Sequence, residues 1–239
     1  MRPLALAYHG IGAVPVRNDP FGLFVSPRRL LRHVAWLRRR GYTLVTFGEL
    51  VERGSDGLAA LTFDDGFADN EQLLALGVPA TVFVTTGWMG GEHPSVPGAR
   101  LIEADGVRRL HAGGIEIGGH TVTHPYLDRL GYDAAVAEMR AGRQRLEALI
   151  DAPVPSFAYP FGIATEETVR ACGAAGFRAA CRTGGVGSVS APLNYPRENM
   201  DGPGTITGLR LKLAERYEPL MSHYPARVVR RIGRWLRPV

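Results

Sequence analysis

Short apolar runs alternate with amphipathic stretches of helical period along most of this chain, and that alternation limits its fold most strongly. Three apolar runs of five or six residues are typical of buried strands: Leu4–Tyr8, Leu58–Phe63 and 80–85. Two longer stretches carry apolar residues three and four positions apart, one capped by Ser26 and the other running from a cap at Asp133 to about Ile150. Strands separated by helices favour parallel pairing with crossover helices, so the sequence predicts an α/β fold.

The same alternation continues through the rest of the chain. The further segments that predict strands or helices are 42–46, 103–112, 115–117, 156–159, 165–175 and 177–182. Glycines and prolines are frequent over 184–204, which we expect to be mostly loop. We find no repeat and no interdomain linker, so we expect one domain over 1–205, followed by a C-terminal helical extension over 206–239.

Length and composition agree with one folded domain and exclude other classes of protein. The chain has 239 residues, of which 45% are hydrophobic and 21% charged, which is too apolar and too mixed for a disordered or fibrous protein. Its net charge of +5 comes from 28 basic and 23 acidic residues, and Lys212 is the single lysine among the basic ones. We attribute the arginine excess to overall composition and expect no nucleic-acid partner.

Cysteine usage and the N-terminal residues point to a compartment. Cys172 and Cys181 form no disulfide framework or metal-binding pair, so we expect buried thiols in a reducing environment. The first residues contain no apolar run long enough for a signal peptide. We therefore expect a cytoplasmic protein.

The last segment, 225–239, has a pattern of its own. Its apolar residues fall on one stripe: Val228, Val229, Ile232, Trp235 and Leu236. Arginines occupy most of the remaining positions, so the segment predicts a basic amphipathic helix. Two interpretations remain open: a helix docked on the domain with solvated arginines, or one that contacts a membrane surface or a partner.

Two adjacent carboxylates, Asp64 and Asp65, directly follow the predicted strand Leu58–Phe63 in the sequence Thr-Phe-Asp-Asp-Gly. Barrel enzymes of the α/β class place their sites at the carboxyl ends of parallel strands. Neighbouring carboxylates repel each other in a cleft unless a cation or a division of roles offsets that cost. One aspartate could bind a metal while the other acts as a base. The alternative is an Asp-Asp-Gly turn with no chemical role.

Two histidines stand four residues apart, at His120 and His124, and this spacing allows both to point at one metal ion. The β-branched residues between them and the following Pro125 argue against a helix, so we expect a turn. With Asp65 they complete a set of two imidazoles and one carboxylate, which leaves positions open for water and substrate. Taken alone, the spacing also fits structural histidines.

A third segment, 157–162, reads Phe-Ala-Tyr-Pro-Phe-Gly, which by itself is only an aromatic strand ending in a turn. The three segments in this order, over roughly residues 1–200, resemble the NodB-homology polysaccharide deacetylases, carbohydrate esterase family 4. The opening Tyr-His-Gly-Ile at 8–11 and the form of the third segment resemble the poly-N-acetylglucosamine deacetylase branch. The resemblance implies a distorted (β/α) barrel with about seven parallel strands and makes 1–205 the deacetylase domain.

The resemblance also implies a role for each matching side chain. Asp65, His120 and His124 would hold one divalent metal, most often zinc, with nickel, cobalt, iron or manganese as alternatives. Asp64 would be the general base that activates a metal-bound water for attack on an N-acetyl carbonyl.

Three aromatic residues complete the expected substrate site. The backbone N–H of Phe161 would donate to the developing oxyanion, and Tyr159 would lie beside it at the substrate. Trp88 either lines the sugar-binding surface or packs in the core.

Two departures from the family pattern bear on the catalytic residues. The third segment usually begins with an arginine that tethers the base, but here that place holds Ala158, and Arg197 is our candidate to supply the guanidinium from another strand. The usual late motif, which carries the histidine that acts as general acid, has no clean match in this sequence. We therefore expect His9, at the end of the first strand, to be the general acid. The histidines that we expect to be structural or solvent-facing are His33, His93 and His111.

The sequence therefore predicts a metal-dependent hydrolase that removes an N-acetyl group from an amino sugar or glycan, which is free, nucleotide-linked, lipid-linked or polymeric. Two alternatives remain: hydrolysis of another non-peptide C–N bond on the same scaffold, or a non-catalytic glycan-binding or assembly protein. Without an export signal we expect a cytoplasmic precursor as substrate. The basic helix over 225–239 would then hold the enzyme peripherally at the inner membrane face.

Overall fold

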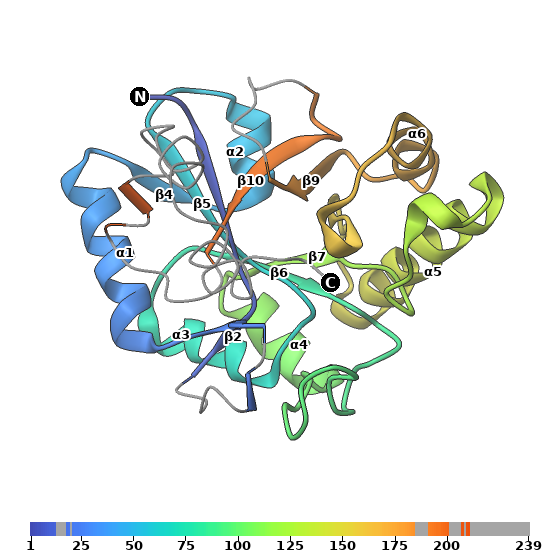
Figure 1. The fold of residues 1–239 in the computed structure, drawn as a ribbon, viewed down its shortest axis with the longest axis horizontal. Coiled ribbons are helices and arrows are strands. Elements are labelled where there is room, and N and C mark those ends of the chain that lie inside the picture. The colour runs from blue at the N-terminus through green and yellow to red at the C-terminus, as the bar shows by residue number, and fades with distance from the viewer. Residues whose placement is uncertain (13–17, 20, 185–190, 201–206, 208, 211–239) are drawn as a thin grey trace, which may run out of the picture.

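A barrel of seven parallel strands forms the centre of the molecule (Figure 1). The computed structural model describes residues 1–12, 18–19, 21–184, 191–200, 207 and 209–210. Around the ring the strands are β1 (Leu4–Tyr8), β5 (Leu58–Phe63), β6 (Thr81–Val84), β7 (Glu116–Gly119), β8 (Ser156–Ala158), β9 (Ala179–Thr183) and β10 (Tyr195–Asn199). β10 pairs again with β1, which closes the ring. The predicted distorted (β/α) barrel with about seven parallel strands is confirmed.

An additional strand, β4 (Thr43–Val45), lies against the amino-terminal half of β5. β1 pairs with β5 along its whole length, so only the other edge of β5 remains for further partners. On that edge β4 pairs with residues 58–60 and β6 with Thr62 and Phe63. The strands β2 (Gly10–Ile11) and β3 (Phe24–Val25) form a separate two-stranded sheet.

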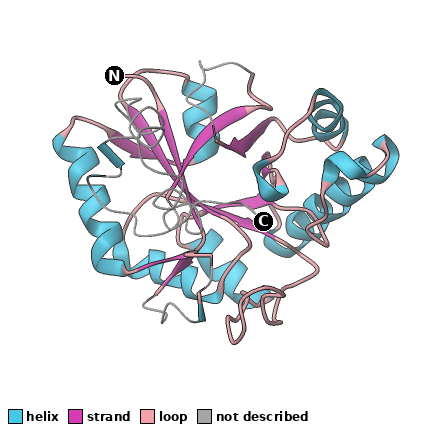
Figure 2. Ribbon diagram, in the orientation of Figure 1, coloured by secondary structure: helices cyan, strands magenta, loops and turns pink. Residues whose placement is uncertain are grey.

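Helices surround the barrel, as Figure 2 shows in cyan around magenta. Their bounds are α1 (Pro27–Arg39), α2 (Phe47–Arg53), α3 (Gln72–Leu76), α4 (Ala104–Ala112), α5 (Tyr132–Ile150) and α6 (Glu166–Ala174). As predicted, Ser26 caps α1, because its hydroxyl accepts a hydrogen bond from the N–H of Arg29. Thr46 and Glu49 form a reciprocal capping box at the start of α2.

Side chains on the barrel strands alternate between two cores. Leu4 and Leu6 of β1 point outward, into a core shared with the buried faces of the helices. Ala5 of β1, Ala60 of β5 and Ala158 of β8 point into the barrel instead. This period of two follows from the pleat of a strand. The small residues inside leave space in the barrel for larger polar side chains.

Helix α2 fills the amino end of the barrel. The ring of Phe47 meets Phe83 and Tyr195 edge to face, with centroids 6.0 and 5.8 Å away. Its backbone N–H donates to Oγ1 of Thr81, at the start of β6, over 2.8 Å. Because this end is packed, the carboxyl end of the barrel is the one that remains for chemistry.

Three local predictions differ from the structure. α5 begins at Tyr132 with Gly131 as its N-cap, so Asp133 lies in the first turn rather than capping the helix; an acid there still favours the helix dipole. Residues 195–199, which we expected to be loop, form β10, a strand whose polar sequence and Pro196 conceal it. α2 went unpredicted because its seven residues are too few to show a helical period.

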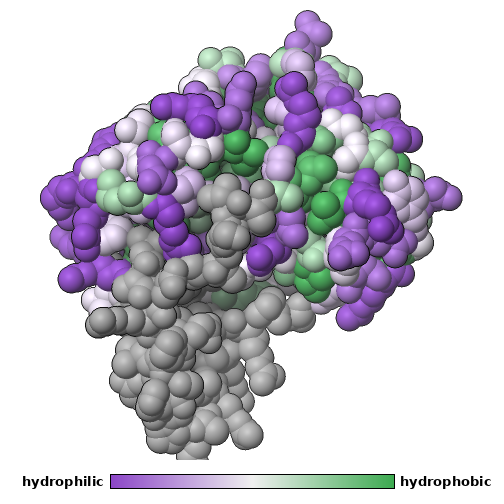
Figure 3. Space-filling model, turned by 90° about the horizontal axis from the view of Figure 1, so that it is seen from above, coloured by the Kyte–Doolittle hydropathy of each residue, from purple (hydrophilic) through white to green (hydrophobic). Residues whose placement is uncertain are grey.

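The described surface is mostly hydrophilic on the face drawn in Figure 3, with apolar areas between the charged side chains. Within the described ranges, every helix is too short or too polar to cross a lipid bilayer. The predicted domain boundary at 205 and the basic helix over 225–239 lie outside the described residues, and both stay predictions.

Packing inside the barrel predicts that Gly118 tolerates no side chain. A Cβ atom at Gly118 would lie 2.3 Å from Cδ1 of Phe83 and 3.1 Å from the carbonyl oxygen of Ser156. We expect Gly118→Ala to lower the free energy of unfolding by about 1–3 kcal/mol, because overpacking forces neighbours to move. Urea unfolding followed by circular dichroism measures the change.

Gly173→Ala is the matched control. Gly173 is exposed on α6, where a Cβ would meet only the flexible side chain of Leu193 at 3.2 Å. Alanine is favoured over glycine in a helix by about 1 kcal/mol, so this variant should be as stable as the wild type or more so. Equal destabilisation of both variants would contradict the packing argument.

Candidate active site

The three sequence segments converge at the carboxyl ends of the barrel strands. Asp64 and Asp65 follow β5, His120 follows β7, and residues 159–162 follow β8. This is the end opposite α2, and it is where barrel enzymes carry their sites. The segments are far apart in sequence, and the closed ring brings them together.

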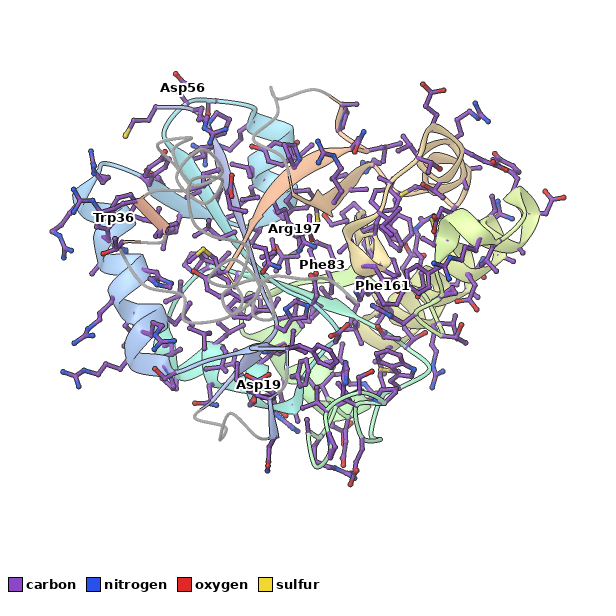
Figure 4. All side chains as sticks on the ribbon, in the orientation of Figure 1. Asp19, Trp36, Asp56, Phe83, Phe161 and Arg197 are labelled. Carbon is purple, nitrogen blue, oxygen red and sulfur yellow. The ribbon has the colours of Figure 1, made fainter. Side chains whose placement is uncertain are left out.

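A buried ion pair joins Asp64 to Arg197 inside the barrel. Nη1 and Nη2 of Arg197 each donate to a different carboxylate oxygen of Asp64 over 2.7 Å, and Nη1 also donates to Oγ1 of Thr62 over 2.7 Å. Arg197 is 1% exposed and Asp64 4%. The guanidinium carbon lies 5.5 Å from the ring centroid of Phe83, and Figure 4 shows the two side chains together in the middle of the barrel. The structure thus places Arg197 where the resemblance requires a guanidinium.

The ion pair keeps Asp64 ionised. Burial raises the pKa of this carboxyl, but the charge and hydrogen bonds of Arg197 outweigh the burial and hold the pKa below its ordinary value. The neighbouring imidazoles of His120 and His9 lower it further. A carboxylate has about four acceptor sites, so the two bonds from Arg197 leave Asp64 able to accept a proton.

Asp65, His120 and His124 meet at one point. Oδ1 of Asp65 lies 3.5 Å from Nε2 of each histidine, and the two Nε2 atoms lie 3.2 Å apart. Ligands about 2.0–2.1 Å from a tetrahedral zinc ion lie roughly 3.3 Å from one another. The three atoms therefore have the mutual spacing of a metal site before any ion is considered.

The hydrogen bonds of these residues also fit a metal. Nδ1 of His120 lies 2.7 Å from the carbonyl oxygen of Ala158, so Nδ1 carries the proton and Nε2 presents a lone pair. Oδ1 of Asp65 is buried and accepts no hydrogen bond from any described residue. Burial, followed by the neighbouring imidazole of His120, lowers the pKa of His124 to about 4, so His124 is neutral at pH 7.

Strained backbone conformations gather in the same place. Five non-glycine residues of the described chain have positive φ, and four belong to the site segments: Asp65 at 71°, Thr121 at 67°, His124 at 57° and Phe161 at 59°. Such conformations cost of order 1–3 kcal/mol each and persist where the surrounding structure enforces them. At Asp65 the turn has a visible purpose. Asp64 continues the inward alternation of β5, and the left-handed residue turns the next carboxylate toward the histidines.

Glu138 of α5 holds the loop between the two histidines. Its Oε2 accepts the N–H groups of Val122 and Thr123 over 3.0 and 3.1 Å, and its Oε1 accepts the hydroxyl of Thr123 over 3.0 Å. The sequence does not reveal this residue, because a glutamate on a helix surface carries no signal of the loop that it contacts. Its three hydrogen bonds fix the turn that aims His124.

Phe161 ends a stack of rings beside the site. Its ring lies face to face with Tyr126, with centroids 3.8 Å apart, and edge to face with His124 at 4.6 Å. The guanidinium of Arg129 covers the other face of Tyr126 at 4.1 Å. Figure 4 shows Phe161 on the side of α5 and α6. The stack fixes the turn that carries the Phe161 backbone.

His9 also lies in the site region. Its charge lowers the pKa of both Asp64 and Asp65, which places the imidazole near the two carboxylates. His9 is partly exposed. Its backbone carbonyl oxygen accepts a hydrogen bond from Nδ2 of the buried Asn70 over 2.9 Å. The structure therefore brings His9 to the site.

Trp88 and Tyr159 differ in their placement. The partly buried ring of Trp88 lies 5.0 Å from His124 and 5.3 Å from His93, so it borders the site. Tyr159 is fully buried, and its hydroxyl donates to the carbonyl of Leu193 over 2.8 Å. Its side chain faces the outer core because it follows Ala158, which points inward. The predicted substrate contact is therefore not made by the Tyr159 side chain.

Comparison with known proteins agrees with the geometry. The family model described as polysaccharide deacetylase matches residues 52–180, which are 129 of the 239 residues and include all three site segments. The chain belongs to the polysaccharide deacetylase family. The resemblance seen in the sequence is thereby confirmed.

Two curated relatives align with parts of the chain. YxkH of Bacillus subtilis (strain 168), assigned to the polysaccharide deacetylases, is 27% identical over 184 residues, or 72% of this chain and 61% of its own length. Chitin deacetylase of Colletotrichum lindemuthianum is 39% identical over 90 residues, or 35% of this chain and 34% of its own length. The chain thus spans less than two thirds of these relatives.

Solved structures share the polysaccharide deacetylase fold. The Streptococcus pyogenes deacetylase PplD, determined with acetate, matches with a TM-score of 0.74 and 20% identity, over 88% of this chain and 97% of its own. IcaB of Ammonifex degensii matches with a TM-score of 0.72 and 21% identity, over 90% of this chain and 97% of its own. At these identities the likeness shows the fold alone.

The buried ion pair predicts a large effect for Arg197→Met. Removing one partner leaves Asp64 buried without its counter-charge, which costs about 3–5 kcal/mol of unfolding free energy at pH 7. Wild-type Asp64, whose pKa is lowered by folding, stabilises the fold above the unfolded pKa of about 3.9, and this contribution is lost as pH falls through the folded value. In the variant the pKa of Asp64 is raised instead. The difference in unfolding free energy between the wild type and Arg197→Met should therefore be largest at neutral pH and smaller in acid.

Arg178→Met is the control, because Arg178 is exposed and its change should cost no more than about 0.5 kcal/mol. Denaturant unfolding at a series of pH values measures both variants. A gap between wild type and Arg197→Met that is small, or that stays constant with pH, would contradict the argument.

Proposed function

We propose that this protein is a metal-dependent hydrolase that removes the acetyl group from an N-acetylated amino sugar or glycan. The observation that carries the proposal is the pairing of two units at one barrel end: an ionised Asp64 held by Arg197, and the adjacent Asp65–His120–His124 group. Family membership supports the reaction class. The alignment with a chitin deacetylase supports an N-acetylated sugar as the substrate.

Asp65, His120 and His124 would hold the metal. Two imidazoles and a carboxylate suit zinc, which we propose as the natural ion, and the same donors also accept nickel, cobalt, iron or manganese. A divalent metal in such a site supplies Lewis acidity, which polarises a carbonyl and makes water a better nucleophile.

Asp64 is the proposed general base. It takes a proton from the water that attacks the acetyl carbonyl, and Arg197 keeps it ionised and correctly oriented until then. The carbon–oxygen bond forms, the carbonyl oxygen becomes negative, and the backbone N–H of Phe161 donates to it. The C–N bond then breaks, and His9 gives a proton to the leaving amine. The products are acetate and the free amino sugar.

The form of the substrate and the place of the reaction extend the same proposal. We propose a precursor in the cytoplasm, nucleotide-linked or lipid-linked, rather than a finished polymer. The basic segment over 225–239 would bring the enzyme to the inner membrane face. Binding to anionic vesicles, compared between the full chain and a chain ending at residue 224, tests the membrane contact.

Asp64→Asn and removal of metal test the reaction. The amide cannot take a proton from water, and a loss of a general base typically costs 10²–10⁴-fold in rate, so we expect acetate release to fall by at least that factor. Chelation should abolish release, and added zinc should restore it. The assay measures acetate from a panel of free, nucleotide-linked, lipid-linked and polymeric N-acetylglucosamine substrates.

The remaining outcomes decide between alternatives. A protein that binds metal but releases no acetate from any substrate would move the assignment to another non-peptide C–N bond. A protein with neither metal nor acetate release would leave the non-catalytic binding protein.

His9→Gln tests the proposed acid separately from the base. Glutamine can form hydrogen bonds but does not supply a proton to the leaving amine, so we expect kcat to fall about 10²–10⁴-fold. The wild-type rate should decline at alkaline pH, where the acid loses its proton, and the variant should lack that decline. An unchanged alkaline limb would exclude His9 as the acid.

A further inference from the structure

A well-tied loop between β6 and α4 carries a buried histidine to the site. Within this loop the N–H of His93 donates to the carbonyl of Ala99 over 2.8 Å, and the N–H of Leu101 donates to Gly91 over 2.9 Å. The N–H of Ile102 donates to the carbonyl of Gly66 over 2.8 Å, which fastens the loop to the turn that follows the two aspartates. His93 thus sits on a frame fixed to the residue next to Asp65.

The ring of His93 is oriented on several sides. It stacks on Phe67 with centroids 5.1 Å apart and an interplanar angle of 12°, and it meets Trp88 edge to face at 5.3 Å. Its Nε2 lies 3.3 Å from Oδ2 of Asp65, and the histidine is 9% exposed. The geometry therefore presents one nitrogen of His93 to the carboxylate oxygen that faces away from His120 and His124.

Hydrogen bonds define which nitrogen of His93 carries the proton. The backbone N–H of Ser95 donates to Nδ1 of His93 over 3.1 Å, so Nδ1 is an acceptor without a proton. In the neutral imidazole the proton then sits on Nε2, which donates to Oδ2 of Asp65. A protonated nitrogen has no lone pair for a metal.

His120 has the opposite assignment. Its Nδ1 faces the carbonyl oxygen of Ala158 and must carry the proton, which leaves the lone pair of Nε2 directed at Asp65 Oδ1. The two histidines flank the same carboxylate, one as a donor to Oδ2 and the other as a potential ligand beside Oδ1. The two oxygens of Asp65 therefore differ: Oδ2 accepts a hydrogen bond from His93, and Oδ1 is available to bind an ion.

We propose that His93 is a positioning residue that fixes Asp65 as a metal ligand through an Nε2–H···Oδ2 hydrogen bond, and that it is not itself a ligand. The inference rests on the metal site of the proposed function. Such outer hydrogen bonds orient metal ligands, and their loss typically weakens metal binding 10–100-fold.

His93→Ala and His93→Gln test the inference through metal affinity. Competition between the apoprotein and a chromophoric chelator measures the Kd for Zn²⁺ and Co²⁺. We expect His93→Ala to weaken binding about 10–100-fold. His93→Gln should recover most of the loss, because its amide N–H₂ can donate to Oδ2. The visible spectrum of bound Co²⁺ should be the same in His93→Gln as in the wild type, because no ligand has changed.

His111→Ala is the matched control, since His111 is exposed on α4 and lies outside the site. Thermal unfolding of each apoprotein separates packing from positioning. A lower Tm with unchanged metal affinity in His93→Ala would overturn the inference and leave His93 a packing residue. A changed Co²⁺ spectrum in His93→Gln would overturn it in favour of a direct ligand.

The inference and the proposed function fail differently. Intact metal binding that depends on His93, together with no acetate release, would support the inference and count against the reaction alone. A wild-type protein that binds neither ion would overturn both.

Discussion

The ion pair between Arg197 and Asp64 is the constraint on which the rest of the site depends. Removing two charges from water costs several kcal/mol each, and such a pair is tolerated when its geometry is good and further hydrogen bonds support it. Here the two bonds of 2.7 Å and the contact with Thr62 meet that condition in a barrel lined with alanines. Because Asp64 is fixed inward, the neighbouring carboxylate must reach the histidines by a left-handed turn.

The strain of that arrangement is supported from outside the barrel. Helix α5 contributes Glu138 to the loop of His124, and the Arg129–Tyr126 stack braces Phe161. These supporting residues lie on the helical layer and the loops, while the residues that they hold follow the ends of strands. This arrangement explains how a site with sparsely populated backbone conformations stays rigid. The packed helices hold those residues in conformations that their local backbone preferences disfavour.

The fold and the Asp65–His120–His124 group could be predicted from sequence because both give local signals. Strand and helix periods extend over five to nineteen residues, and the Asp-Asp and His-x-x-x-His spacings are short. Long-range partners give no such local signal. Arg197 meets Asp64 across 133 positions, from a strand whose polar sequence resembles a loop, and the family resemblance alone made it a candidate. His93, expected to be structural or solvent-facing, reaches Asp65 only through the cross-tied loop. Had the inward position of Ala158 on that short strand been known, it would have predicted that the side chain of Tyr159 points outward.

The closed barrel has a consequence for how this family can vary. Ala158 and Arg197 project into one shared interior, although β9 lies between their strands. A guanidinium that reaches Asp64 can therefore come from β8 or from β10. When β10 supplies it, the residue at 158 can be small. Both guanidinium groups would meet the same carboxylate, Asp64, so a second buried guanidinium would add a charge that the existing pair already neutralises. Among homologues, arginine at one of these two positions should exclude arginine at the other.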